Sequence, residues 1–254
     1  MESMTVTATE RTMYLPEILA HTRSVVAERK AAADLRAMER AAVEHEPRGF
    51  ARALRAAAAM GPTIIAELKK ASPSKGLIRA EFDAAGLAVE MEAGGAAVLS
   101  VLTDEMFFQG SLENLRRASA AVWLPCLRKD FMVDEFQMLE ARANRADAIL
   151  LIVAALTDAE LKRLRASARS YGLDVLCEVH DAEELERACE LADRLPKTAV
   201  RVAESGIHTQ ADMRRLSAAG FEAFLIGESL MRESKPGGAL ASLLRGSLKQ
   251  ANVY

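Results

Sequence analysis

Aromatic residues and cysteines are scarce in this chain of 254 residues, and each scarcity excludes a class of protein. Only 5% of the residues are aromatic whereas 50% are hydrophobic, so the core must be built from aliphatic side chains and alanine. The three cysteines, Cys126, Cys177 and Cys189, are an odd number at wide spacings, which argues against a disulfide framework or a cysteine metal site. We expect buried, reduced thiols in a cytoplasmic protein.

Long apolar runs and an excess of positive charge are also missing. No apolar stretch reaches the ~18 residues of a membrane span, and the first residues, MESMTVTATERTMYLP, lack the apolar region of a signal peptide. The chain has 33 Lys and Arg against 36 Asp and Glu, a formal net charge of −3, which argues against a general nucleic-acid-binding face. We therefore expect a small-molecule partner, no nucleic acid and no membrane.

What the chain does have is a regular alternation of strand and helix signals. Short apolar runs are separated by amphipathic segments at a spacing of about 23 to 34 residues, the length of a βα repeat. The expected strands are Thr63–Leu68, Ala97–Leu102, Leu124–Leu127, Ala148–Val153, Val175–Val179, Ala199–Ala203 and Ala223–Ile226. The expected helices are Leu15–Met38, Phe50–Met60, Asp83–Glu92, Leu112–Ala121, Glu135–Asn144, Asp158–Tyr171, Ala182–Arg194, Thr209–Ala218 and Ala239–Lys249.

This order of elements predicts an α/β fold of the (β/α)8 TIM-barrel type. We interpret residues 1–254 as a single domain, with an N-terminal helical extension over 1–61 and the barrel over 62–254. The alternative is an open doubly wound sheet, which the lack of a GxGxxG motif after the first strand disfavours. Only seven strands are recognisable, although a closed barrel of this kind needs eight.

The first expected strand ends in opposite charges. Glu67 and Lys69 lie two residues apart, so a strand directs both side chains to the same side. The loop SPSKG follows, rich in hydroxyl, backbone and cationic donors. Because charge at the end of a buried strand is costly unless it has a partner or a function, we interpret this region as the floor of a site for an anionic substrate.

Polar residues recur at most of the other strand ends, where barrels of this type carry their chemistry. The segments are LRKDF, CEVH, AESG and LIGES. The last two place Gly beside Ser or Glu just before a helix, an arrangement whose backbone N–H groups and helix dipole favour a phosphate. His180 is expected to be a loop or supporting histidine that does not face the same way as Glu178.

Taken together, these segments resemble the indole-3-glycerol-phosphate synthase family. The matching stretches run from about Tyr14 to Arg232 and are IIAELKKASPSKG, SVLTDEMFFQGS, LPCLRKDF, AILLIVAAL, LCEVHD, RVAESGI and FLIGESLMR. The resemblance implies a carboxy-lyase of tryptophan biosynthesis, an aromatic amino-acid pathway. Its reaction closes the ring of 1-(2-carboxyphenylamino)-1-deoxyribulose 5-phosphate, with loss of carbon dioxide and water, and uses no cofactor and no metal.

The resemblance also implies roles for individual residues. Lys129 would be the general acid and Glu178 the general acid/base, with Glu67 and Lys69 lining the same pocket. A second lysine and burial would lower the pKa of Lys129 toward neutrality, whereas a carboxylate would raise it. The implied substrate contacts are Ser72 and Glu204 for polar groups, Phe108, Phe131 and Leu150 for the aromatic ring, and Ser205, Gly206, Gly227 and Glu228 for the phosphate.

The chain departs from the family between Glu178 and Glu204. The family has a further strand, a loop of the type Gly-(Ile/Val)-Asn-x-Arg-Asp-Leu and a helix there, whereas here one helix fills the interval, with Asp181 as N-cap and Glu184 as its capping-box partner. About one βα unit, roughly 25 to 30 residues, is missing. Besides a synthase of low activity, two alternatives remain: a related phosphate-sugar barrel isomerase of tryptophan or histidine biosynthesis, and an inactive truncated barrel. We expect a monomer.

Overall fold

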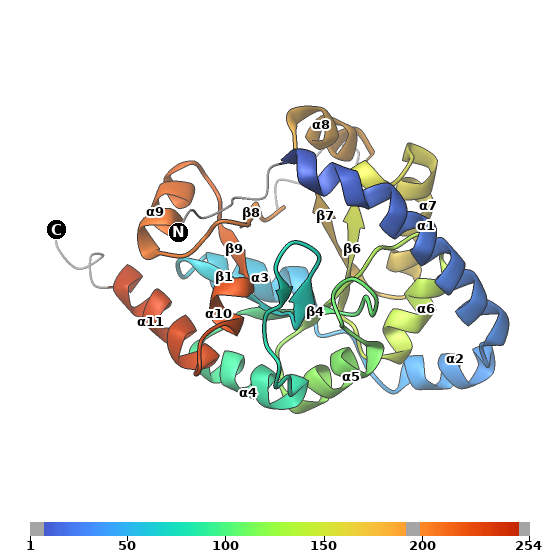
Figure 1. Cartoon of the computed structure of the whole chain (residues 1–254), viewed down its shortest axis with the longest axis horizontal. Coiled ribbons are helices and arrows are strands. Elements are labelled where there is room, and N and C mark those ends of the chain that lie inside the picture. Colours follow the sequence, from blue (N-terminus) through green and yellow to red (C-terminus); the bar gives the residue numbers. More distant parts are fainter. Residues whose placement is uncertain (1–7, 192–198, 249–254) are drawn as a thin grey trace.

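Seven parallel strands form one curled sheet in a computed structural model that describes residues 8–191 and 199–248 (Figure 1). The strand order is β7-β6-β5-β4-β1-β9-β8. The strands are β1 (Thr63–Leu68), β4 (Val98–Leu102), β5 (Cys126–Lys129), β6 (Ala148–Ile152), β7 (Asp174–Glu178), β8 (Val202–Glu204) and β9 (Ala223–Ile226). This arrangement is a partial TIM barrel, as the alternation of elements predicts.

Helices cover the outside of the sheet, and three more precede it. The N-terminal helices are α1 (Ala8–Ala32), α2 (Leu35–Val43) and α3 (Phe50–Ala58). The helices of the barrel are α4 (Ala84–Gly94), α5 (Leu112–Ala121), α6 (Phe136–Ala143), α7 (Asp158–Ser170), α8 (Ala182–Leu191), α9 (Gln210–Ala218), α10 (Glu228–Met231) and α11 (Pro236–Leu248). No helix in the part of the chain that the structure describes is long and apolar enough to cross a bilayer.

The two faces of each strand bury different sets of side chains. Ile64, Ala66 and Leu68 of β1 belong to the large cluster that packs under the outer helices. Ile65 belongs to a second, inner cluster, which Phe50 of α3 closes. Because side chains alternate along a strand, Glu67 lies on the inner side, one step beyond Ile65. The inner cluster is completed by Leu54, Val98, Leu127, Ala148, Ala223 and Leu225.

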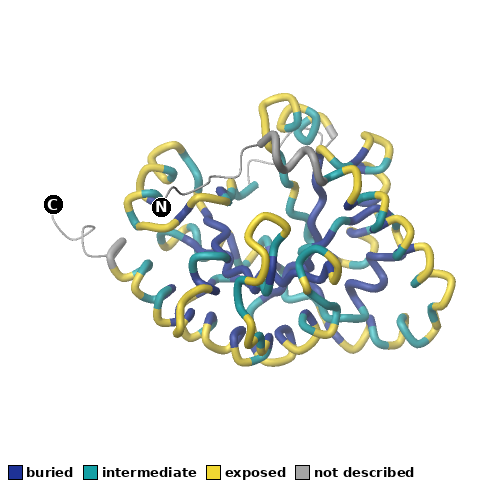
Figure 2. The backbone as a smooth tube through the Cα atoms, viewed as in Figure 1, coloured by how far each residue is buried: buried dark blue, intermediate teal, exposed yellow. Residues whose placement is uncertain are grey.

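The barrel is open between β7 and β8. Among the described residues, β7 pairs with β6 alone and β8 with β9 alone, so each has one unpaired edge. Strands β1 and β6 are buried along their whole length, whereas β7 is only partly buried (Figure 2). Cys177 of β7 is exposed. The expected burial of Cys177 is therefore wrong, and the reason is the absence of a neighbour on that side of β7.

Several element boundaries differ from those expected. The single helix expected over Leu15–Met38 is two helices, because the carboxylate of Asp34 accepts the backbone N–H of Ala37 at 3.0 Å and begins α2. The third expected strand starts at Cys126, after Pro125, so Lys129 lies inside β5. The helix expected to reach Arg194 is described only as far as Leu191, since residues 192–198 lie outside the described part.

Two short strands and one 3-10 turn at the carboxyl ends of the barrel strands were not expected. The SPSKG loop forms a small antiparallel pair, β2 (Ala71–Ser72) and β3 (Gly76–Leu77). The last residue of the strand expected over Ala148–Val153 instead begins a 3-10 turn, η1 (Val153–Ala155). The strand expected over Ala199–Ala203 starts only at Val202, and it extends to Glu204. These shifts are one to three residues and leave the inward and outward faces as expected.

Candidate active site

Lys129 occupies the centre of a charged cluster at the carboxyl ends of the strands. Its Nζ atom lies 3.0 Å from Oε2 of Glu178 on β7 and 3.5 Å from Oε2 of Glu204 on β8. All three side chains are largely withdrawn from solvent, with exposed fractions of 14%, 14% and 28%. One ammonium from the middle of the sheet thus contacts carboxylates on both unpaired edges, so the expected neighbours meet although the barrel is open.

Glu67 and Lys69 form a second ion pair at the end of β1. Nζ of Lys69 lies 2.6 Å from Oε2 of Glu67, whose side chain is only 3% exposed. The two charges thus satisfy each other, as their spacing on one side of a strand predicts. Glu67 also acts electrostatically on Lys129. The two ion pairs therefore belong to one site.

The charges around Lys129 shift its pKa in the direction opposite to the one that we expected. Burial would lower the pKa of Lys129, but the facing carboxylates, Glu204 first, raise it above the ordinary lysine value. Burial would raise the pKa of Glu178, but Lys129 and then His180 hold it below the ordinary glutamate value. The expectation of a lysine pKa lowered toward neutrality is wrong for this structure, because the carboxylates outweigh burial and Lys69 is paired with Glu67.

The residues expected to hold an aromatic ring partly come together. The rings of Phe108, in the loop after β4, and Phe131, in the loop after β5, have centroids 6.3 Å apart and are tilted by 42°. Leu150 is buried on β6, on the same face as Ala148 of the inner cluster. The backbone carbonyl of Phe108 accepts the N–H of Ala71 at 3.2 Å, which ties this loop to the β2–β3 pair.

The residues expected to hold a phosphate lie at two neighbouring strand ends. The register between β8 and β9 pairs Glu204 with Leu225, so the segments that follow these strands begin side by side. Ser205 and Gly206 turn sharply, each with a φ of +69°. Gly227 directly precedes α10, whose first residue is Glu228. The carboxylate of Glu228 contacts Arg232 at 3.0 Å, so this residue offers an anion only its backbone N–H.

Ser72 is engaged locally rather than with the other site residues. Its Oγ accepts the backbone N–H of Lys75 at 3.3 Å, inside the β2–β3 turn. The sequence places Ser72 close to Lys69, but in the structure its hydroxyl bonds to the turn and not to the charged cluster. Its expected contact with substrate stays a prediction.

Arg128 anchors the strand that carries Lys129, although no role was expected for it from the sequence. Its guanidinium is fully buried on the outer face of β5, 2.8 Å from both Oδ2 of Asp130 and Oε2 of Glu140. Oδ2 of Asp130 also accepts the hydroxyl of Thr103 at 2.7 Å. The alternation of Arg128 outward and Lys129 inward in the motif RKD was the available signal.

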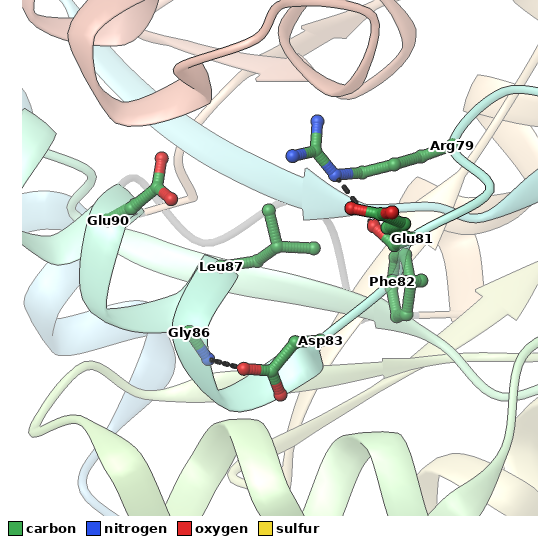
Figure 3. Close-up of a pocket in the computed structure, with 7 residues that line it drawn as sticks. All are labelled: Arg79, Glu81, Phe82, Asp83, Gly86, Leu87 and Glu90. Carbon is green, nitrogen blue, oxygen red and sulfur yellow. Dashed lines mark hydrogen bonds between the residues drawn. The ribbon is translucent and has the colours of Figure 1, made fainter.

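A shallow hollow of about 370 Å³ lies away from this cluster, at the beginning of α4 (Figure 3). Its lining carries three carboxylates, and its guanidinium, Arg79, is bonded to the carbonyls of Glu81, Met231 and Glu233. Asp83 accepts the N–H of Gly86 at 3.2 Å and pairs with Arg117. This hollow has no free cation to offer an anionic substrate, and none of the expected site residues lines it.

Comparison with known sequences decides the family. The family model described as "Indole-3-glycerol phosphate synthase" matches residues 15–195 and 188–243. Proteins of that name from Koribacter versatilis, Acidithiobacillus ferrooxidans and Azospirillum brasilense are 54%, 46% and 47% identical to this chain. In the same order, the alignments cover 91%, 90% and 87% of this chain. They cover 98%, 97% and 95% of the three relatives. The chain belongs to the indole-3-glycerol phosphate synthase family.

The same comparisons locate what distinguishes this member of the synthase family. The alignment with the Koribacter versatilis protein runs over 255 positions but covers 91% of this chain, or about 231 residues. About two dozen residues of that relative therefore have no counterpart here. The two matches of the family model overlap over residues 188–195, so this stretch corresponds to two places in the family. The overlap falls between β7 and β8, where the barrel is open.

Solved structures support the fold alone. A 3-hexulose-6-phosphate synthase matches with a TM-score of 0.56 at 15% identity, covering 73% of this chain and 99% of that one. A mutant tryptophan synthase α-subunit from Pyrococcus furiosus matches with a TM-score of 0.55 at 12% identity, covering 72% and 98%. At these identities the likeness shows a shared barrel architecture and no shared activity.

Proposed function

We propose that this chain carries out the synthase reaction at a reduced rate, with Lys129 as its general acid. The observation that carries the proposal is the contact of Nζ of Lys129 with the carboxylates of both Glu178 and Glu204 at the mouth of the partial barrel. Active sites of TIM barrels lie at this end of the strands. The substrate is inferred from family membership. Within the cluster, Lys129 is the proposed general acid and Glu178 the proposed general acid/base.

The proposed sequence of proton transfers uses the cluster in order. As the ring carbon that bears the carboxylate attacks the sugar carbonyl carbon, Lys129 gives its proton to the carbonyl oxygen. Loss of carbon dioxide restores the aromatic ring, and Glu178 serves the later proton transfers that remove the hydroxyl as water. Because the carboxylates at Nζ oppose loss of the lysine charge, binding of the substrate must replace one of them before Lys129 is a competent acid.

The rest of the site would hold the two ends of the substrate. Backbone N–H groups of Ser205, Gly206, Gly227 and Glu228 face the phosphate, supported by their neighbouring positions after β8 and β9. Phe108, Phe131 and Leu150 flank the aromatic ring, while Glu67, Lys69, Ser72 and Glu204 contact its polar groups. The cationic lysines match a substrate that carries both a phosphate and a carboxylate.

The replacement Lys129→Ala tests this assignment. Turnover, followed by the fluorescence of the indole product, is expected to disappear, while the affinity for indole-3-glycerol phosphate in calorimetry stays within about tenfold. The matched control is Lys162→Ala, which removes an exposed lysine of α7. A kcat of Lys129→Ala close to that of the parent chain refutes the proposal. The same samples are also assayed for the phosphate-sugar isomerase reactions. Isomerase turnover without synthase turnover would identify the alternative activity.

The open barrel favours a second candidate, a phosphate-sugar-binding barrel without turnover. The Asn and Arg that the family carries in its additional loop have no counterpart here, and β7 and β8 lack a common neighbour in the described residues. Calorimetric binding of indole-3-glycerol phosphate with no detectable product formation would identify this state. The assignments of a cytoplasmic, monomeric, single-domain protein with the barrel over 62–254 belong to the same proposal.

A further inference from the structure

His180 follows the end of β7 and turns back toward Glu178. Its Nε2 atom lies 3.3 Å from Oε1 of Glu178, while Oε2 of the same carboxylate contacts Lys129 at 3.0 Å. The expectation that His180 does not share the side of Glu178 is therefore wrong. The loop after β7 brings the imidazole to the one oxygen of Glu178 that Lys129 does not take, so both oxygens of this carboxylate have a cationic neighbour.

The other ring nitrogen of His180 has its own carboxylate. Nδ1 lies 3.3 Å from Oε2 of Glu184, in the first turn of α8, and the same oxygen accepts the backbone N–H of His180 at 2.9 Å. Glu184 was expected to complete a capping box with Asp181. Only half of that box is present: Oδ1 of Asp181 accepts the N–H of Glu184 at 2.9 Å, but the carboxylate of Glu184 goes to His180.

Carboxylates on both ring nitrogens select one protonation state of His180. A neutral imidazole has one N–H donor, so it can satisfy only one of the two carboxylates, whereas an imidazolium donates to both. The hydrogen bond to Glu178 is the main cause that raises the pKa of His180 to about 8, with Glu184 adding to it and partial burial opposing it. At neutral pH this histidine is therefore largely a cation.

We propose that His180 is a positioning residue for Glu178, held in place by Glu184, and that its imidazolium fixes the orientation and the ionised state of the Glu178 carboxylate. This role rests on the proposed function of Glu178 as acid/base. The chain of contacts runs from Lys129 through Glu178 and His180 to Glu184 and joins β5, β7 and α8. The other charges that face it are Glu204 of β8 and Glu67 of β1, both through Lys129.

The role of His180 predicts a basic limit to activity. As the pH rises through about 8, His180 loses its charge and can keep only one of its two carboxylate contacts. Glu178 then keeps Lys129 but loses its second cation, so its orientation loosens and its pKa rises toward the ordinary value. Turnover is expected to fall on this limb, while binding of the phosphate end, at the tips of β8 and β9, is retained.

The proposal is tested first without any activity measurement. The four histidines are followed by NMR titration of the full chain, and His180→Gln identifies the signal of His180. We expect a midpoint near 8 in the parent chain, a fall toward the ordinary histidine value of ~6.5 in Glu184→Gln, and no change in Glu183→Gln. Glu183 is an exposed carboxylate one residue away on α8, so its replacement removes the same charge from the same helix.

The kinetic arm then separates positioning from simple folding support. In His180→Gln we expect kcat at pH 7 to fall about tenfold, which corresponds to ~1.4 kcal/mol, with KM changed less than twofold. In Glu184→Gln the basic limb of kcat should move to lower pH with the midpoint of His180. Thermal unfolding checks that both variants fold.

Each outcome decides the proposal. A His180 midpoint near 6.5 in the parent chain, or a midpoint that Glu184→Gln leaves unchanged, overturns it. Equal loss in kcat and in stability, without a shift of the pH profile, also overturns it. If the parent chain shows no turnover at all, the proposed function fails, whereas the titration still reports whether His180, Glu178 and Glu184 form the linked group.

Discussion

Gly227 lies directly against the side chain of Glu67, so closely that a methyl group at Gly227 would sit 2.9 Å from Cβ of Glu67 and 3.0 Å from its Cδ. The contact exists because Ala66 of β1 pairs with Ile226 of β9, which places the next residue of each strand on the same inner side. Gly227 has a φ of −128° and a ψ of −68°, a combination outside the α and β regions that residues with a side chain prefer. Because Gly227 has no side chain, there is room for the side chain of Glu67 beside it. This is a second role, in addition to the phosphate contact proposed for Gly227.

Replacing Gly227 by Ala is expected to displace Glu67 and with it Lys69. Overpacking against Glu67 should cost ~1–3 kcal/mol of folding free energy, and the backbone of Gly227, outside the α and β regions, should add ~1–3 kcal/mol. We expect kcat/KM to fall by more than tenfold. Chemical denaturation and the fluorescence assay measure the two effects. The matched control is Gly238→Ala in α11, where a methyl group meets only ordinary contacts and the helix gains ~0.5–1 kcal/mol. Equal behaviour of the two variants would contradict this account.

Removing the charge of Lys129 should destabilise the fold in a pH-dependent way. Lys129→Met leaves Glu178 and Glu204 without their shared cation, a loss of ~3 kcal/mol for a buried pair. The native pKa of Glu178 is depressed, so its stabilising contribution is present above its unfolded pKa of ~4.3 and is lost as the pH falls through the native pKa. The difference in the free energy of unfolding from the parent chain should thus be large at pH 7 and shrink below pH ~4.3, as the pH falls toward the native pKa of about 2. Lys162→Met, on the surface, should show no such difference.

Asp147 ties the segment before α3 to the bottom of the barrel. It is fully buried and accepts the backbone N–H of Arg48 and that of Cys126, each at 2.6 Å, and it contacts His45 at 3.1 Å. Burial would raise its pKa, but His45 and Arg48 hold it below the ordinary value. Asp147→Asn is expected to lower the free energy of unfolding by ~3–5 kcal/mol at pH 7.

The pH dependence of Asp147→Asn provides its check. The contribution of a depressed carboxyl is complete above its unfolded pKa of ~3.9 and disappears as the pH falls through the native value. Urea unfolding of the parent chain and the variant should therefore converge below pH ~4. Ser170→Ala, at the exposed end of α7, serves as a control that leaves the curve unchanged. A variant that is as stable as the parent chain at pH 7 would contradict the assigned network.

Restoring the absent residues should close the barrel. We expect that inserting the residues of the Koribacter versatilis protein that lack a counterpart here, between Leu191 and Ala199, raises both the melting temperature and kcat/KM. The physical reason is that a strand placed between β7 and β8 would pair two open edges. A Gly/Ser insertion of equal length is the control, since it lengthens the loop without supplying a strand. An insertion that improves neither quantity would show that the open edge is not what limits this chain.

The reactivity of the cysteine thiols should reflect the open edge of β7. Cys177 is exposed, whereas Cys126 is buried on β5, where burial raises its pKa to about 12. In the folded protein a thiol reagent at pH ~8.5 should label Cys177 and leave Cys126 unmodified until denaturant is added. Peptide mapping by mass spectrometry identifies the labelled sites. In the chain with the inserted strand, labelling of Cys177 should be slower. In the parent chain, labelling of Cys126 before unfolding would contradict its assigned burial.

The sequence by itself determined the parts of this protein that depend on local spacing. The period of two along a strand placed Glu67 and Lys69 on the same side, and the repeat length indicated a barrel with one unit too few. These inferences hold because the direction of a side chain on a strand follows from its position in the strand alone. The residue motifs were sufficient to indicate the family as well, because strand ends collect the chemistry of such barrels.

Only the tertiary structure decided how these residues act on one another. Which carboxylates face Lys129, and hence the direction in which its pKa moves, depends on strands that are distant in the chain. The contact of Gly227 with Glu67, the turn that brings His180 to Glu178 and the exposure of Cys177 depend in the same way on how neighbouring strands and loops are placed. Such long-range proximity arises from the register and closure of the sheet, which no local period specifies.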